Sequence, residues 1–359
     1  MGIKMKKGIA LVTIMAVVMG LTACSGQKTD SSVDMDSRVE SVDNGQDDTK
    51  NTQEAQTSDV PVTDTPSQNT EDTSVVYMTS DISPEGLIKV YEVLDWTPKG
   101  NVAVKVSTGE PPASNYLKPS LIKDVVQQVK GTIVECNTAY GGSRSETEMH
   151  YQVAKDHGFT DIADVKIMDE DGSMTLPVEG GKHLSENYVG KAFADYDSFL
   201  VISHFKGHAM AGFGGAIKNI SIGIASSEGK SWIHTGGTSK SGFYGDQDDF
   251  LESMGEAGKA VSDSLGEGKN IVYINVMNRL SVDCDCDGNP SEPDMHDIGI
   301  LASHDPVALD QACVDLVYGA SDGESLVERI ESRNGLHTLE YAEKIGLGSR
   351  NYELKNIDD

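Results

Sequence analysis

The sequence predicts an α/β protein with a mostly parallel or mixed sheet flanked by helices, and two observations carry this prediction. Apolar runs short enough to be buried strands recur along the chain, and the clearest are 199–202 and 271–277. Amphipathic segments with helical spacing separate such runs, as at 119–130. In an α/β protein of this kind, binding and catalytic sites gather beyond the carboxyl ends of the strands.

Taken in order, the predicted elements fill the chain from residue 75 onward. Ser83 and Pro84 are typical of an N-cap followed by proline in the first turn, and Gly131 is typical of a helix end. Predicted strands lie at 75–78, 101–107, 132–136, 164–168, 199–203, 271–277 and 298–303. Predicted helices lie at 84–94, 119–130, 145–157, 306–318, 324–332 and 338–345.

The first 24 residues predict export. Three lysines precede the apolar stretch 8–20, which is too short to span a bilayer as a mature helix. The sequence Leu-Thr-Ala-Cys that ends at Cys24 resembles the bacterial lipoprotein signal, which implies cleavage before Cys24 and lipidation of its thiol. We therefore expect a lipid-anchored protein outside the cytoplasmic membrane, with an ordinary signal peptide as the alternative.

Residues 25–74 predict a disordered acidic linker, because they contain almost no large apolar side chains. Residues 75–359 are long enough to bury a sizeable core, and we expect them to form the folded α/β domain. The formal net charge of the chain is −28. This charge argues against nucleic acid as a partner and against electrostatic attachment to anionic lipid.

The strand predicted at 199–203 leads into the most informative stretch of the chain. Histidines, lysines and glycines follow it in close succession, at His204, Lys206, His208, Gly214, Gly215, Lys218 and Asn219. Glycine amides and two ammonium groups suit a carboxylate or phosphate, and a desolvated lysine can act as an acid or base. Two solvated lysines and two satisfied histidines are the alternative, since the glycines favour a loop in which the four-residue histidine spacing means less.

A second glycine-rich turn follows the strand predicted at 132–136. Gly141 and Gly142 precede Arg144 and the helix predicted at 145–157. A turn that feeds a helix N-terminus can bind an anion, and Arg144 can clamp a carboxylate or phosphate. Most such turns are only turns, and this alternative stays open.

Cys284 and Cys286 lie in the loop Asp-Cys-Asp-Cys-Asp-Gly, just after the strand predicted at 271–277. Cysteines separated by one residue seldom form a relaxed disulfide with each other, and two thiolates framed by carboxylates need a cation. We therefore predict a metal site, with disulfides to Cys136 or Cys313 as the alternative. Cys313 reads more simply as a buried free thiol in a helix.

The metal predicted from these ligands is zinc or iron, since thiolate and imidazole suit both. His204 or His208 would add to the two cysteines, and we expect the two regions to meet in space. His296, with Asp294 or Asp297, lies close behind the cysteines in the sequence and offers another way to complete the ligand shell. A classical four-cysteine iron–sulfur cluster is not expected, because the spacing of ferredoxin cysteines is absent.

Several motifs together resemble one protein family. They are NTAYGGSR, SHFKGHAMAGFGGAIKN, CDCDG and DIGILASHDPVALDQACVDL. They are similar to the family called domain of unknown function 362, often labelled an iron–sulfur-centre protein, over nearly all of the folded part. The matching positions are Lys206, His208, Gly215, Lys218, Asn219, Cys284, Cys286, Asp305, Pro306 and Asp310. The resemblance implies no reaction, and the ferredoxin-type insertion of many members is missing here.

These observations indicate a membrane-anchored exported protein with a metal-binding, enzyme-like site for an anionic small molecule. In this interpretation Lys206 and Lys218 bind the anion or transfer protons, and Arg144 holds its acidic group. A lipoprotein that captures a solute or a metal without catalysis is the alternative. A structural or adhesive surface protein would leave both the lysine–histidine stretch and the cysteine loop unexplained.

Overall fold

The computed structural model describes residues 73–358. The predicted signal peptide, 1–24, and nearly all of the predicted linker, 25–74, lie outside the described residues. Regular structure begins with β1 (Ser74–Thr79), next to the start predicted for the folded domain. Within the described part of the chain, no helix is long and apolar enough to cross a membrane.

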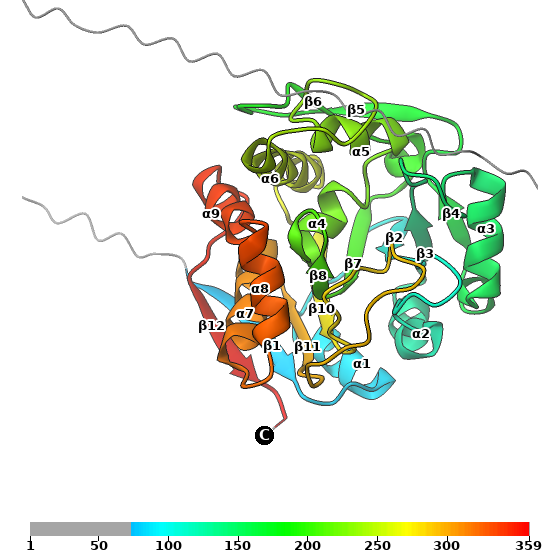
Figure 1. Cartoon of the computed structure of the whole chain (residues 1–359). Coiled ribbons are helices and arrows are strands. Elements are labelled where there is room, and N and C mark those ends of the chain that lie inside the picture. Colours follow the sequence, from blue (N-terminus) through cyan, green and yellow to red (C-terminus); the bar gives the residue numbers. More distant parts are fainter. Residues whose placement is uncertain (1–72, 359) are drawn as a thin grey trace, which may run out of the picture. The chain divides into compact units, whose positions relative to one another are not determined.

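A single eight-stranded sheet organises the domain and confirms the predicted fold class (Figure 1). Its strand order is β12-β1-β11-β10-β7-β2-β3-β4. The strands are β2 (Val102–Lys105), β3 (Thr132–Glu135), β4 (Val165–Ile167), β7 (Ser198–His204), β10 (Ile271–Met277), β11 (Gly299–Ser303) and β12 (Tyr352–Asn356), together with β1. The five neighbouring strands β10, β7, β2, β3 and β4 pair in parallel. β11 is antiparallel to both of its neighbours, and β12 pairs in parallel with β1.

Helices cover both faces of the sheet, which explains why β7 and β10 are buried along their whole length and largely apolar. One face packs against α1 (Pro84–Glu92), α2 (Pro119–Gln128) and α3 (Thr147–Asp156). The other face packs against α4 (Ala216–Ser221), α6 (Gln247–Ser264), α7 (Pro306–Gly319), α8 (Glu324–Ser332) and α9 (Leu336–Lys344).

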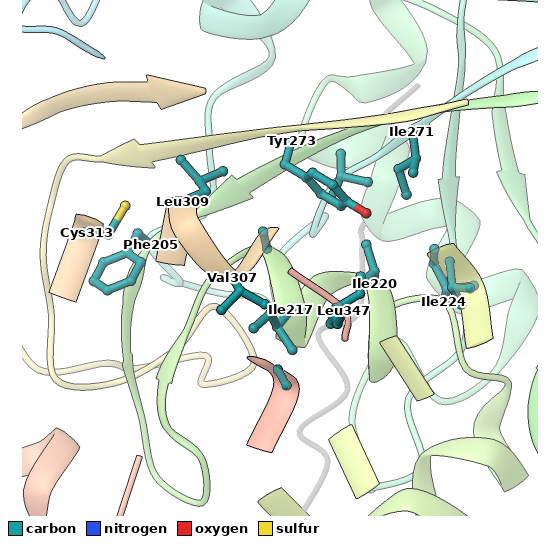
Figure 2. Packing of buried hydrophobic residues seen from close by; sticks show 14 of the residues in the cluster. Phe205, Ile217, Ile220, Ile224, Ile271, Tyr273, Val307, Leu309, Cys313 and Leu347 are labelled. Atoms are coloured by element: carbon teal, nitrogen blue, oxygen red, sulfur yellow. The ribbon is translucent and has the colours of Figure 1, made fainter. Parts of the chain in front are cut away.

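Side chains of the central strands alternate between the two cores, as the two-residue period of a strand requires. Leu200 and Ile202 of β7 join the core beneath α1 and α2, whereas Phe199 and Val201 join the opposite core. Figure 2 shows this second core, where Tyr273 of β10 lies on the same side of the sheet as the α4 and α7 side chains.

The stretch that follows β7 forms regular structure rather than the predicted loop. β8 (Lys206–His208) and β9 (Gly212–Gly214) pair as a short antiparallel hairpin, and α4 begins directly afterwards. The sequence also gave no prediction for the hairpin of β5 (Ser173–Pro177) and β6 (Glu186–Gly190), for α5 (Ser227–His234), or for α6. Two short 3-10 turns, Phe159–Asp161 and Lys191–Asp195, complete the described chain.

Candidate functional site

A cavity of about 330 Å³ opens beyond the carboxyl ends of β2, β3 and β7, where sites are expected in such a sheet. The hairpin β8–β9, the start of α4, the end of α5 and the cysteine loop complete its walls. The two stretches singled out in the sequence therefore meet in space, as predicted.

Asp285 joins the cysteine loop to the end of β7. Its carboxylate accepts hydrogen bonds from His204 Nδ1 and from Lys206 Nζ, each at 2.8 Å, and only 2% of the side chain is exposed. Burial opposes ionisation, but the charges and hydrogen bonds of Lys206 and His204 outweigh it and hold the pKa of Asp285 well below its usual range. Asp285 therefore stays charged and fastens the loop to the sheet.

Gly207 allows the cysteine loop to lie directly against β8. Its amide donates to the carbonyl of Ser281 at 2.8 Å, and a Cβ at this position would lie 2.3 Å from the carbonyl oxygen of Val282. The glycine between Lys206 and His208 thus has a packing reason. It brings both side chains to the cavity wall.

His208, Cys284 and Cys286 lie close enough together to hold a metal ion, since their ligand atoms are all within 4.8 Å of one another. Cys286 Sγ is 4.0 Å from His208 Nε2. The structure joins Cys284 to Cys286 in a disulfide, with the two Cα atoms 5.2 Å apart. The expectation that these two cysteines would not bond to each other is therefore wrong.

The physical reason for this pairing is a tight turn in the loop, in which Asp287 N donates to the carbonyl of Cys284. The turn directs both sulfur atoms to one side. Cys136 and Cys313 are buried free thiols, so the disulfides considered as an alternative do not form. Two thiolate ligands thus require that the Cys284–Cys286 bond first be reduced.

The hydrogen bonds of His208 fix its tautomer. Its Nδ1 accepts from the backbone amides of Met210 at 3.2 Å and of Ala211 at 2.9 Å. Burial and the charge of Lys218 hold the pKa of His208 well below 6.5, so the ring is neutral. The one ring proton therefore sits on Nε2 and points at Cys286. The thiolates suit a soft metal, but His208 can join them only after Nε2 gives up that proton.

His204 makes no part of this group, because both of its nitrogens are occupied: Nδ1 by Asp285 and Nε2 by the carbonyl of Asn278 at 2.6 Å. The other ligands considered from the sequence lie elsewhere. His296 pairs with Asp322, Asp294 accepts from Ser325, and Asp297 accepts from the amide of Arg279.

Asp310 of α7 lies against the end of the glycine-rich stretch and binds the start of α4. The carboxylate of Asp310 accepts from the amides of Ala216 and Ile217, at 2.7 and 3.0 Å. A Cβ on Gly215 would lie 2.2 Å from Asp310 Oδ1, so only glycine leaves room for this contact. Asp310 thereby occupies the first two amides of α4, directly after Gly214 and Gly215, whose amides were expected to bind an anion.

Lys218 and Asn219 project from the first turn of α4 toward the cavity. Asn219 is fixed by hydrogen bonds to Ser203 and to the carbonyl of Ile202. Among the described residues, the ammonium group of Lys218 has no hydrogen-bond or ion-pair partner. Burial, together with the charges of Lys206 and Lys105, lowers the pKa of Lys218 to about 7.

Arg144 lines the cavity, but protein groups already occupy its guanidinium. Nε bonds Glu110 at 3.1 Å, and Nη1 bonds Glu135 at 3.3 Å. Nη2 donates to the hydroxyl of Tyr140. Gly141 and Gly142 are exposed and do not line the cavity. The guanidinium that was predicted to clamp an anion is therefore part of a buried ion-pair network. Sequence alone could not show that two carboxylates face this arginine.

Several cavity residues were missed by sequence reasoning: Lys105, Glu135, Lys230 and His234. Lys105 is 1% exposed and pairs with Glu135 at 3.0 Å. A lysine inside the apolar strand 102–105 was a usable signal, since a buried charge requires a partner. His234 gave no comparable signal.

His234 has the tautomer opposite to that of His208. Its Nδ1 donates to the carbonyl of Lys230 at 2.6 Å, which leaves the lone pair on Nε2. Burial lowers the pKa of His234 to about 4; the hydrogen bond to the carbonyl of Lys230 opposes this shift, and the charges of Lys218 and Lys230 make smaller contributions in the same direction as burial. The cavity therefore contains a neutral imidazole that can accept a proton.

The fold and the site define an α/β protein with a cation-lined cavity at the strand ends and a histidine–cysteine group in its wall. The family described as "Domain of unknown function (DUF362)" matches residues 102–315, which is more than half of the chain. The chain belongs to that family. Among curated proteins, none matches the sequence.

Two solved structures are similar to parts of the chain. The lactate racemase apoprotein from Thermoanaerobacterium thermosaccharolyticum has 15% sequence identity and a TM-score of 0.37, over 56% of this chain and 50% of that one. A protein from Thermotoga maritima has 15% identity and a TM-score of 0.36, over 73% of this chain and 58% of that one. This chain thus spans about half the length of the racemase apoprotein.

Proposed function

We propose that this protein is an exported, membrane-anchored lipoprotein whose cavity binds an anionic small molecule and acts on it as an enzyme. One observation carries the proposal: in a chain with a net charge of −28, the cavity is lined by an excess of cationic side chains. The cations are Lys105, Arg144, Lys206, Lys218 and Lys230, and the carboxylates are Glu135 and Asp285.

The charge excess favours an anion because protein carboxylates neutralise only part of it. Lys105 and Arg144 share Glu135, and Lys206 has Asp285. Lys218 has no partner among the described residues. A ligand carboxylate or phosphate supplies the missing negative charge, in a site where charges are poorly screened by water.

Proton transfer suits the same cavity. A lysine with a pKa of about 7 exchanges its proton at neutral pH, which is the condition for efficient general acid–base catalysis. His234 offers an unprotonated Nε2 in the same wall. In this proposal Lys218 is the acid or base, and Lys206, fixed by Asp285, orients the anion.

We include a metal in the proposal for the reduced protein only. Cys284 and Cys286 would hold zinc or iron as thiolates, with His208 as the third side chain. A bound metal would polarise an oxygen atom of the ligand. Lipidation of Cys24 and the linker 25–74 would place the domain outside the cell membrane, and this part of the proposal rests on the sequence alone.

Metal analysis of the full chain tests the metal-binding part. We expect about one equivalent of metal when the protein is purified without oxygen and with a reductant, and almost none after oxidation. The double variant C284S/C286S should lose the metal. The matched control C136S, which changes a buried cavity thiol outside the group, should keep it.

Each other outcome has a definite meaning. Metal retained by C284S/C286S, or no metal in the reduced wild type, overturns the metal-binding part. The variant His208→Gln separates the contribution of the histidine: unchanged metal content would mean that the thiolates act without it. Fatty-acid labelling of cells that produce the wild type and C24S tests the anchor, since C24S should lose the label.

A further inference from the structure

One amine in the cavity differs from all the other cations there. Lys105 binds Glu135, Lys206 binds Asp285, and Arg144 binds two carboxylates, while Lys230 donates to the carbonyl of Ala225 at 2.6 Å. Lys218 Nζ alone among these cations makes no hydrogen bond or ion pair with any described residue, although it lines the same wall. A polar group in a cavity with no protein partner is available to a ligand.

The surroundings of Lys218 disfavour its charged form. Burial is the largest effect, and the ammonium groups of Lys206, Lys105 and Lys230 add to it, while only Asp285 opposes it. Lys218 and Lys206 both pass close to Gly214: a Cβ there would lie 3.4 Å from Cδ of Lys218 and 3.9 Å from Cε of Lys206, in ordinary van der Waals contact with each. A lysine that is desolvated beside other cations is the usual form of an amine nucleophile.

We propose that Lys218 forms an imine with a small 2-oxo acid, so that the anion bound by this cavity carries a carbonyl group next to its carboxylate. This inference rests on the proposed function, because it needs an anion held by the same cationic wall. It adds the chemical class of the ligand and a covalent step.

The step balances without any other reactant. The lone pair of Lys218 Nζ attacks the carbonyl carbon, and the carbonyl oxygen becomes a hydroxyl group. Nζ loses its two protons and the hydroxyl leaves as water, which gives the C=N bond. His234 Nε2 can carry one of these protons between nitrogen and oxygen, since its lone pair is free in the observed tautomer.

The rest of the cavity suits a small ligand of this kind. Its volume of about 330 Å³ is near the lower end of the usual range for small-molecule sites. Lys206 is held in place by Asp285 and can receive the carboxylate while Lys218 reacts with the neighbouring carbonyl carbon. When the imine nitrogen takes up a proton from the solvent, it withdraws electrons from the carbon beside it, which is why imines activate 2-oxo acids.

Reductive trapping of the full chain tests the inference. The protein is incubated with pyruvate at pH 7, treated with sodium borohydride, and mapped by peptide mass spectrometry. We expect the reduced adduct on Lys218 at a level about tenfold or more above that on the exposed Lys123 and Lys269. K218R should lose this adduct, and the matched variant K123R should keep it.

The outcomes separate the inference from the proposed function. Adduct spread evenly over exposed lysines overturns the imine, and mapping in the wild type gives this answer even if K218R fails to fold. Acetone lacks the carboxylate: if it labels Lys218 as well as pyruvate does, Lys218 is a reactive amine, but the anion-binding proposal fails and with it the choice of a 2-oxo acid as the ligand. If pyruvate binds by calorimetry but leaves no adduct on Lys218, the anion-binding proposal stands and the imine fails.

Discussion

Replacing Asp285 by asparagine removes one negative charge from the point where the cysteine loop meets the sheet. The substitution keeps the size of the side chain and leaves the backbone bond from Glu110 N to the carbonyl of Asp285 in place. Lys206 loses its only carboxylate partner at 2.8 Å, and His204 loses a charged acceptor. The variant therefore isolates the charge from the packing of the loop.

The size of the effect follows from burial. Two unit charges at 2.8 Å attract each other by about 6 kcal/mol at an effective dielectric constant of about 20. Desolvation offsets part of this attraction, and removal of one partner from a buried pair costs about 3–5 kcal/mol in measured cases. The side chain of Asp285 is 2% exposed, so we expect D285N to lower the free energy of unfolding by about 3–5 kcal/mol.

Urea unfolding at pH 7 measures this loss, and Asp287 provides the control. Asp287 lies in the same loop but is exposed, and its Oδ1 accepts from the amide of Asn289, a bond that asparagine can also make. D287N should change the free energy of unfolding by less than about 0.5 kcal/mol. The double variant K206M/D285N removes both charges and should recover most of the lost stability.

A cost below about 1 kcal/mol for D285N would refute the reasoning, because the pair would then behave as an exposed one. Equal costs for D285N and D287N would also refute it, since burial could not then be the cause. If K206M/D285N is no more stable than D285N, the lost contact with His204 accounts for the effect instead of the charge of Lys206.

Two further predictions concern the frame around the cavity. Gly215→Ala should lower the free energy of unfolding by about 1–3 kcal/mol in a urea titration, because the new Cβ would lie 2.2 Å from Asp310 Oδ1. Gly141→Ala is the control and should be nearly neutral, since no atom lies within 4 Å of its Cβ. Equal effects of the two substitutions would contradict this explanation. Glu135 is buried, but Lys105 and other neighbours lower its pKa from 4.5 to about 2. Because the folded pKa lies below the unfolded one, Glu135 contributes its stability above pH 4.5 and loses it as the pH falls toward 2. The difference in unfolding free energy between wild type and E135Q should therefore shrink between about pH 6 and about pH 3, and a constant difference would count against this assignment.

The elements that were predicted well from the sequence are those whose residues are buried on all sides and therefore form continuous apolar runs. β7 and β10 are covered on both faces, so their apolar runs were visible. α6 was missed because helices pack around it and its buried positions include Glu252 and Glu256, which a search for an apolar stripe does not select. The β8–β9 hairpin was missed because glycine, which allows its close packing, also reads as a loop.

The site was located from the sequence more accurately than it was interpreted. Placing Lys206, His208 and the cysteine loop together needed only the expectation that strand ends share one edge of the sheet. Which partner each group finds depends on contacts far apart in the chain. Arg144 meets Glu110 and Glu135, and both nitrogens of His204 are taken. The spacing of residues in the sequence does not show which hydrogen-bond or ion-pair partner each polar group finds in the fold.

The different environments of Lys206 and Lys218 explain how one cavity can hold an anion and also react with it. Lys206 has a carboxylate partner, Asp285, which holds it in place. Lys218 stands on α4, whose first amides bond to Asp310, and its side-chain nitrogen has no hydrogen-bond or ion-pair partner among the described residues. A charged lysine can only attract the ligand, whereas an amine with a free lone pair can form a bond to it. Every other cation in the cavity binds a protein carboxylate or carbonyl, whereas Lys218 has no partner among the described residues, and this difference is what separates binding from chemistry in this cavity.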